Sequence, residues 1–85
     1  MERISHVVSA SYVQARVLEI RFSDGSIKHV DFAPYIARGG VFEPLSSLGY
    51  FKKFFVDVNT VCWPNGADVA PERLFEIGVL IKAAA

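Results

Sequence analysis

The stretch Val61-Cys62-Trp63-Pro64-Asn65-Gly66-Ala67-Asp68-Val69-Ala70-Pro71-Glu72-Arg73-Leu74 decides the fold of this chain. It begins in a β-branched and aromatic run, which is typical of a strand. Asn65-Gly66 then favours a left-handed turn, and Pro71 stands where the first residue of a helix would be. Glu72 follows it, next to the positive end of the helix dipole. The stretch therefore predicts a last strand that turns into a terminal helix.

Downstream of this stretch, the apolar residues extend the predicted helix as far as Ile81. They leave little polar surface on it, so this helix belongs to the core, to an interface, or to both. The chain has 85 residues and is 52% hydrophobic, and a domain of this size buries only about 60% of its unfolded surface. We therefore expect a homodimer, formed through the terminal helix or an exposed sheet edge.

Upstream, the first part of the chain predicts an N-terminal strand and a hairpin. Ile4 to Ser9 is a short first strand, followed by a break at 9–11. Tyr12 to Phe22 alternates as a second strand, and a shift of parity at Val17-Leu18 suggests a β-bulge or burial on both faces.

The turn of the first hairpin is predicted to be the three-residue loop Ser23-Asp24-Gly25, with Gly25 in the left-handed conformation. This loop sets Leu18 opposite Val30, whereas a two-residue Asp-Gly turn would set Leu18 opposite Asp31. It also keeps Ile20, Val30 and Phe32 on one face.

Short helices and a second hairpin fill the middle of the chain. Residues 33–38 form a short helix that Gly39-Gly40 ends, Pro44 makes a bend, and residues 46–54 carry another helical turn or two. The inward residues there are expected to be Leu48, Phe51 and Phe54. Residues 55–58 and 60–63 form the second hairpin, with Asn59 at its turn.

The whole pattern predicts an α+β fold in a single domain that spans residues 1–85. It consists of a small antiparallel sheet of two hairpins plus an N-terminal strand, short connecting helices and a C-terminal helix.

Composition and charge argue against several classes of function. Nine basic and nine acidic residues give a formal net charge of zero, which makes nucleic acid an unlikely ligand for this chain by itself. Its apolar runs are far shorter than the ~18 residues of a membrane span. The N-terminus lacks the apolar run of a secretory signal, so we expect a cytoplasmic protein.

One cysteine and two histidines are too few soft ligands for a four-ligand zinc site. The sequence also lacks a glycine-rich phosphate-binding motif. We therefore expect neither a metal nor a cofactor.

Four residues of the opening stretch are candidate binding residues: Trp63, Asn65, Asp68 and Glu72. Trp63 and Asn65, together with Tyr35, have the composition of a recognition surface. The alternative is that Trp63 fills the core and Asn65-Gly66 only supplies a turn, and the sequence leaves both open. Asp68 and Glu72 could form a carboxylate pair, but stabilising the helix start or pairing with Arg73 is the more ordinary role.

No set of catalytic residues is predicted. His29, or His6, could join Asp31 or Asp24 in proton transfer, but a solvated or hydrogen-bonded strand histidine is the more ordinary case. Cys62 is expected to be a buried, inert thiol.

The order of motifs resembles that of a bacterial family, domain of unknown function 2442. The resemblance rests on Phe22-Ser23-Asp24-Gly25, Val30-Asp31-Phe32, Gly40-Val41-Phe42-Glu43-Pro44-Leu45, Tyr50-Phe51 and above all Trp63-Pro64-Asn65-Gly66-Ala67-Asp68-Val69-Ala70-Pro71-Glu72-Arg73-Leu74-Phe75. It implies a small α+β module without an established activity. Members are often encoded beside a small protein of domain of unknown function 4160, an arrangement similar to a toxin–antitoxin pair.

These observations lead to three hypotheses. The first is a non-catalytic protein-interaction module, an antitoxin-like partner of a small toxin-like protein encoded by the neighbouring gene. The second is a regulatory module associated with DNA. The third is a small-molecule-binding protein or enzyme around Trp63, Asp68 and His29.

Overall fold

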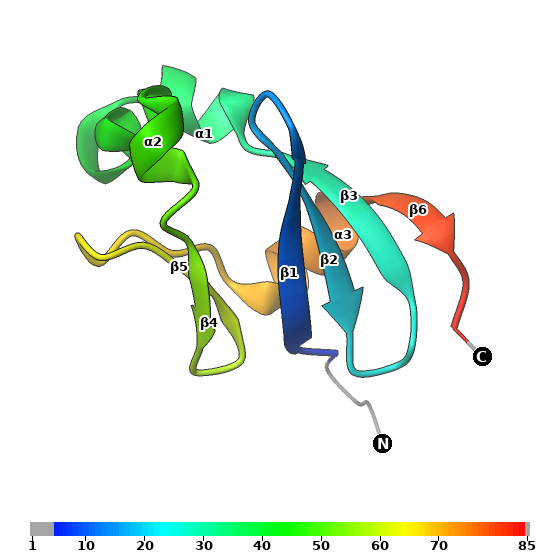
Figure 1. Cartoon of the computed structure of the whole chain (residues 1–85). Coiled ribbons are helices and arrows are strands. Elements are labelled where there is room, and N and C mark those ends of the chain that lie inside the picture. The colour runs from blue at the N-terminus through cyan, green and yellow to red at the C-terminus, as the bar shows by residue number, and fades with distance from the viewer. Residues whose placement is uncertain (1–4, 85) are drawn as a thin grey trace.

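Four antiparallel strands form the main sheet of the computed structural model, which describes residues 5–84 (Figure 1). Strands β1 (Val7–Gln14), β2 (Val17–Phe22) and β3 (Ile27–Asp31) follow one another as a meander. The fourth strand, β6 (Val79–Lys82), pairs with β3, so that the order is β1-β2-β3-β6. With its helices and a separate two-stranded sheet, the protein has the predicted α+β fold.

The hairpin of β2 and β3 has the predicted register. Leu18 lies opposite Val30, and the loop residue Gly25 has a φ of 92°, in the left-handed region that glycine adopts without strain. Within the loop, the hydroxyl and the backbone N–H of Ser26 both donate to the carboxylate of Asp24, at 2.6 and 2.9 Å. These hydrogen bonds lower the pKa of Asp24.

The first two strands do not divide where the sequence predicted. β1 runs without a break from Val7 to Gln14, and the chain turns at Ala15-Arg16 instead of passing through one long strand. The prediction of one strand from Tyr12 to Phe22 was wrong, because no glycine, proline or asparagine signals this turn. The β-bulge suggested at Val17-Leu18 has a counterpart, since the register of β1 and β2 shifts between Tyr12 and Gln14, opposite Leu18 and Val17. Ala15 takes a positive φ of 45°, and Phe32 donates its N–H to the Arg16 carbonyl at 2.8 Å. The predicted start of the strand at Ile4 lies outside the described residues.

Three short helices cluster at one end of the sheet (Figure 1). They are α1 (Ala33–Ala37), the 3-10 helix η1 (Gly40–Ser46) and α2 (Leu48–Phe51). The first confirms the predicted short helix. Pro44, which was predicted to make a bend, lies inside η1. Phe51 is buried as expected, but Leu48 is exposed, contrary to the prediction.

The second hairpin, β4 (Phe55–Asp57) with β5 (Thr60–Cys62), forms its own two-stranded sheet beside β1 (Figure 1). Val7 of β1 donates its N–H to the Asn59 carbonyl at the hairpin's tip, at 2.9 Å. The turn consists of Val58 and Asn59, with φ values of 48° and 69°. Two consecutive positive φ values define the turn type that suits the twist of a hairpin, but valine is a poor residue for it.

Replacing Val58 by asparagine is expected to stabilise the protein by about 1 kcal/mol, because a β-branched side chain in the left-handed region is strained. The substitution removes little buried apolar surface, since Val58 is 79% exposed. Urea denaturation followed by circular dichroism measures the change. Val56→Asn is the matched control, because Val56 lies in β4 without a positive φ, and it should be neutral or destabilising. A Val58→Asn protein less stable than the wild type would contradict the strain argument.

The C-terminal helix is shorter than the sequence predicted. α3 runs from Pro71 to Ile77, and Gly78 then takes an extended conformation that leads into β6. The expected helix through Ile81 was wrong, because the apolar run also has the composition of a strand and the edge of β3 is available for pairing. Lys28 of β3 secures the end of α3 by donating its ammonium to the Phe75 carbonyl at 2.6 Å. A cation there also complements the negative end of the helix dipole.

The core lies between one face of the sheet, the short helices, the second hairpin and α3. Its largest side chain is that of Trp63, which is 1% exposed and donates its indole N–H to the Phe51 carbonyl at 2.8 Å. Its ring centroid is 5.3 Å from that of Phe32 and 5.7 Å from that of Phe51. Leu74 of α3 reaches the same core, so the helix is held against the sheet by burial.

Candidate functional site

Two of the four candidate residues have clear roles in the architecture. Trp63 fills the core, which leaves no part of its indole for a partner. The Asn65 side chain lies in the turn after β5, where its oxygen accepts the Ala67 N–H at 3.1 Å. Its amide donates to the Val41 carbonyl in η1 at 2.9 Å, which ties the turn to that helix. The structure thus favours the core and turn reading of the sequence for these two residues.

Asp68 and Glu72 are exposed, whereas Trp63 is buried, so the four candidate residues do not share one exposed surface. Asp68 makes an isolated antiparallel bridge with Cys62. Glu72 lies in the first turn of α3, where a carboxylate complements the helix dipole, while the N-cap is Ala70, without a side-chain hydrogen bond. Arg73 pairs with Glu76 at 3.9 Å instead of with either acid.

The Cys62 thiol is half-buried and poorly suited to nucleophilic chemistry. Burial raises its pKa, and the negative charge of Asp68 raises it further. Its sulfur lies 3.6 Å from the Asp57 carbonyl and 3.7 Å from that of Thr60. A raised thiol pKa keeps the thiolate fraction low at neutral pH, so the expected inert role fits this environment.

The hydrogen-bond partner of His29 is a glutamate and not one of the aspartates. His29 Nε2 lies 3.0 Å from the Glu19 carboxylate of the neighbouring strand. Asp24 is engaged by Ser26 in its loop, and Asp31 accepts the Ala33 N–H at 2.9 Å. His29 is therefore a hydrogen-bonded strand histidine, which is the more ordinary of the two roles that the sequence left open.

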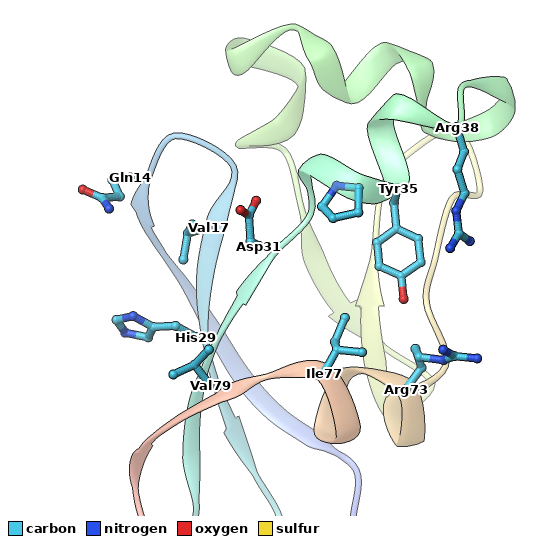
Figure 2. A pocket seen from close by; sticks show the side chains of 10 residues that line it. Gln14, Val17, His29, Asp31, Tyr35, Arg38, Arg73, Ile77 and Val79 are labelled. Carbon is cyan, nitrogen blue, oxygen red and sulfur yellow. The ribbon is translucent and has the colours of Figure 1, made fainter.

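A cleft lies between α1 and α3, where β3 continues past the start of β6 (Figure 2). We call it the α1–α3 cleft. It has a volume of about 560 Å³, within the range of about 300–1,000 Å³ that small ligands occupy. Its walls are formed by Gln14, Val17, His29, Asp31, Pro34, Tyr35, Arg38, Arg73, Ile77 and Val79.

A second hollow of about 340 Å³ adjoins the cleft on the side of α3. Tyr35, Arg38 and Arg73 line both, so the two concavities lie next to each other at these side chains. Asp68 lines the second hollow. Of the four candidate residues, Asp68 is thus the one that lines either concavity.

The two arginines give one end of the cleft a positive character. Figure 2 shows Arg38 and Arg73 on the same side with Tyr35 beside them, and His29 and Gln14 on the opposite side. The Arg38 guanidinium carbon lies 5.3 Å from the centroid of the Tyr35 ring, a cation–π distance. The Arg73–Glu76 pair is long and its side chains are 60% and 74% exposed, so it holds Arg73 only weakly.

Sequence reasoning found one of the three central residues of this cleft. Tyr35 was a recognition candidate, whereas Arg38 was not considered and Arg73 was considered only as an ion-pair partner. Arg38 belongs to no motif, and Arg73 lies within the Trp63–Phe75 motif without standing out there as a binding residue. Arg38 follows α1, whereas Arg73 lies in α3. Both line the same cleft because the chain segments that carry them lie at the end of β3, which no local pattern of the sequence reveals.

The described part of the chain offers no group of three or more His, Cys, Asp or Glu residues that could hold a metal ion. Within residues 5–84, none of the helices has the length and apolar character needed to cross a membrane.

The comparisons with known proteins identify a family. Neither the curated proteins nor the solved structures gave a significant match. The sequence model of one family, described as protein of unknown function (DUF2442), matches residues 7–79, which cover all strands before β6, the helices and the α1–α3 cleft. The match agrees with the resemblance carried by the hairpin and the Trp63–Phe75 motif, and the chain belongs to the DUF2442 family.

Proposed function

We propose that this protein is a non-catalytic protein-interaction module, which binds an extended segment of a partner along β6. The observation that carries the proposal is the exposure of this strand. Val79, Leu80 and Ile81 are 67%, 55% and 52% exposed, and the adjoining Ile77 of α3 is 39% exposed. An apolar strand at an open sheet edge offers both unpaired backbone groups and apolar contacts to a second chain.

The two edges of the main sheet differ in a way that supports this surface. The edge at β1 has the β4–β5 hairpin beside it, fastened by the hydrogen bond from Val7 to Asn59. The edge at β6 has no further strand beyond it among residues 5–84. Lys82 and the register shift opposite Ile27 are features that natural proteins use to discourage unspecific pairing at such an edge.

The α1–α3 cleft continues this surface, since Ile77 and Val79 belong to both. Tyr35, Arg38 and Arg73 add the residue types that are enriched at the energetic centres of interfaces. Cys62 and the His29–Glu19 pair do not provide an activated nucleophile. Recognition therefore accounts for the surface better than catalysis does.

The family resemblance suggests a partner to test, the small DUF4160-type protein encoded beside many members. The two purified proteins are expected to co-elute in size-exclusion chromatography at micromolar concentration. Leu80→Lys should abolish co-elution, because it places a charge in the apolar contact. Val8→Lys is the matched control, since Val8 is 52% exposed at the opposite edge. Failure to co-elute, or equal loss in both variants, would contradict binding of this partner at β6.

The same edge can pair with a second copy of this chain, and this is the homodimer that we propose instead of one through α3. Light scattering of the isolated protein distinguishes the two occupants. If the wild-type protein is a dimer and Leu80→Lys is a monomer, β6 is the dimer interface. If the wild-type protein is a monomer at all concentrations, the homodimer is contradicted.

A further inference from the structure

We infer that the α1–α3 cleft binds an acidic side chain of the partner's extended segment, seated between Arg38 and Arg73. The inference rests on the proposed function, because it adds a sequence preference to the segment that pairs with β6. Val79 provides the geometric link, since it lies in β6 and also lines the cleft. Figure 2 shows Val79 beside His29. A segment that follows β6 toward its first residue therefore arrives at the His29 end of the cleft, and its acidic residue continues past Ile77 toward the arginines.

The donors of the two arginines are available to a ligand. Within residues 5–84, neither guanidinium donates a hydrogen bond to a protein acceptor, and the one ion pair of Arg73 is the long, exposed contact with Glu76. For comparison, Arg16 uses its guanidinium to hold the Leu45 and Ser46 carbonyls. A guanidinium presents five N–H donors in a planar fork that matches a carboxylate.

The acids near the cleft do not neutralise this end of it. Asp31 already accepts the Ala33 N–H, and Figure 2 shows it apart from Arg38 and Arg73. Glu19 lies across the sheet next to His29. Asp68 lines the adjoining hollow, where it can orient Arg38 or Arg73 without occupying the cleft itself.

The remaining walls of the cleft indicate which side chains of the bound segment lie next to its acidic residue. Pro34, Ile77 and Val79 provide an apolar lining, and the phenol of Tyr35 stands beside the two cations with an apolar ring and a hydroxyl. This lining fits the aliphatic side chains of an extended peptide. The ligand class is therefore a β-branched, extended segment that carries one glutamate or aspartate.

The experiment uses fluorescein-labelled seven-residue peptides of alternating valine and threonine, with one glutamate placed at each position in turn, and their glutamine counterparts. Binding to the full chain is measured by fluorescence anisotropy. We expect the best glutamate peptide to bind about tenfold more tightly than its glutamine counterpart, which corresponds to about 1.4 kcal/mol, because a charged acceptor strengthens hydrogen bonds from a guanidinium. The preference should disappear in Arg38→Gln and Arg73→Gln, and persist in Arg21→Gln, whose arginine is exposed on β2.

The outcomes separate this inference from the proposed function. Equal affinity for glutamate and glutamine peptides, with both lost in Leu80→Lys, overturns the cleft assignment and leaves strand addition intact. Equal weakening by Arg21→Gln and by the cleft variants also overturns it, because the preference would then reflect general charge. Absence of binding to every peptide overturns both. Urea denaturation of each variant verifies that it is folded.

Discussion

Replacing Trp63 by alanine is expected to lower the free energy of unfolding by about 3–5 kcal/mol. The indole is 1% exposed and contacts the rings of Phe32 and Phe51, so the substitution leaves a large cavity. It also removes the donor to the Phe51 carbonyl, which leaves a buried acceptor without its partner. A domain of this size has about 4–13 kcal/mol of stability in total, so urea denaturation should show a variant close to unfolding.

Two further variants separate packing from hydrogen bonding. Trp63→Phe keeps most of the ring but not the N–H, and should cost about 1–3 kcal/mol. Phe55→Ala removes an aromatic side chain that is 43% exposed, and should cost less than either. If Trp63→Ala were no more destabilising than Phe55→Ala, then Trp63 would not be the centre of the core.

Replacing Gly78 by alanine is expected to destabilise the protein by about 1–3 kcal/mol for a steric reason. The backbone of Gly78 has a φ of −67°, which any residue adopts. A Cβ there would lie 2.8 Å from the Cβ of Lys28 and 3.0 Å from the Leu74 carbonyl oxygen. Both atoms belong to rigid parts of β3 and α3, so the two elements must move apart. Urea denaturation measures the loss.

Gly49→Ala is the matched control for this substitution. Gly49 lies in α2, and a Cβ there would meet only the Ser47 hydroxyl at 4.0 Å. Alanine also favours the helix over glycine, so this variant should be neutral or slightly stabilised. Because Gly78 stands between Ile77 and Val79, Gly78→Ala should weaken partner binding as well. A Gly78→Ala protein of full stability would contradict the close packing of α3 on β3.

The sequence predicted the parts of the fold in which local patterns agree with each other. Asp24-Gly25 and the apolar alternation together determine the register of β2 and β3, and Pro34 with Gly39-Gly40 delimits α1. It failed where a local pattern is ambiguous. The turn at Ala15 lacks the usual turn residues, and the apolar run after Gly78 suits a helix or a strand equally until the edge of β3 is known.

The candidate site was less predictable than the fold. Trp63 and Asn65 drew attention because their residue types are common in recognition, but rare residues also concentrate where the architecture needs them. The arginines of the cleft are ordinary surface residues in the sequence. Their meaning depends on where α1 and α3 meet, which is a property of the tertiary structure.

The pairing of β6 with β3 has a consequence for the dynamics of the sheet. β1, β2 and β3 join through short turns, whereas β6 pairs with residues about fifty positions earlier in the chain, so its docking requires closure of a long loop. β6 has only four residues, all with exposed side chains, and three of them are paired with β3. Such a segment opens at a lower free energy than the meander and exchanges its amide hydrogens sooner. Binding of a partner segment along β6 would therefore also increase the order of this strand.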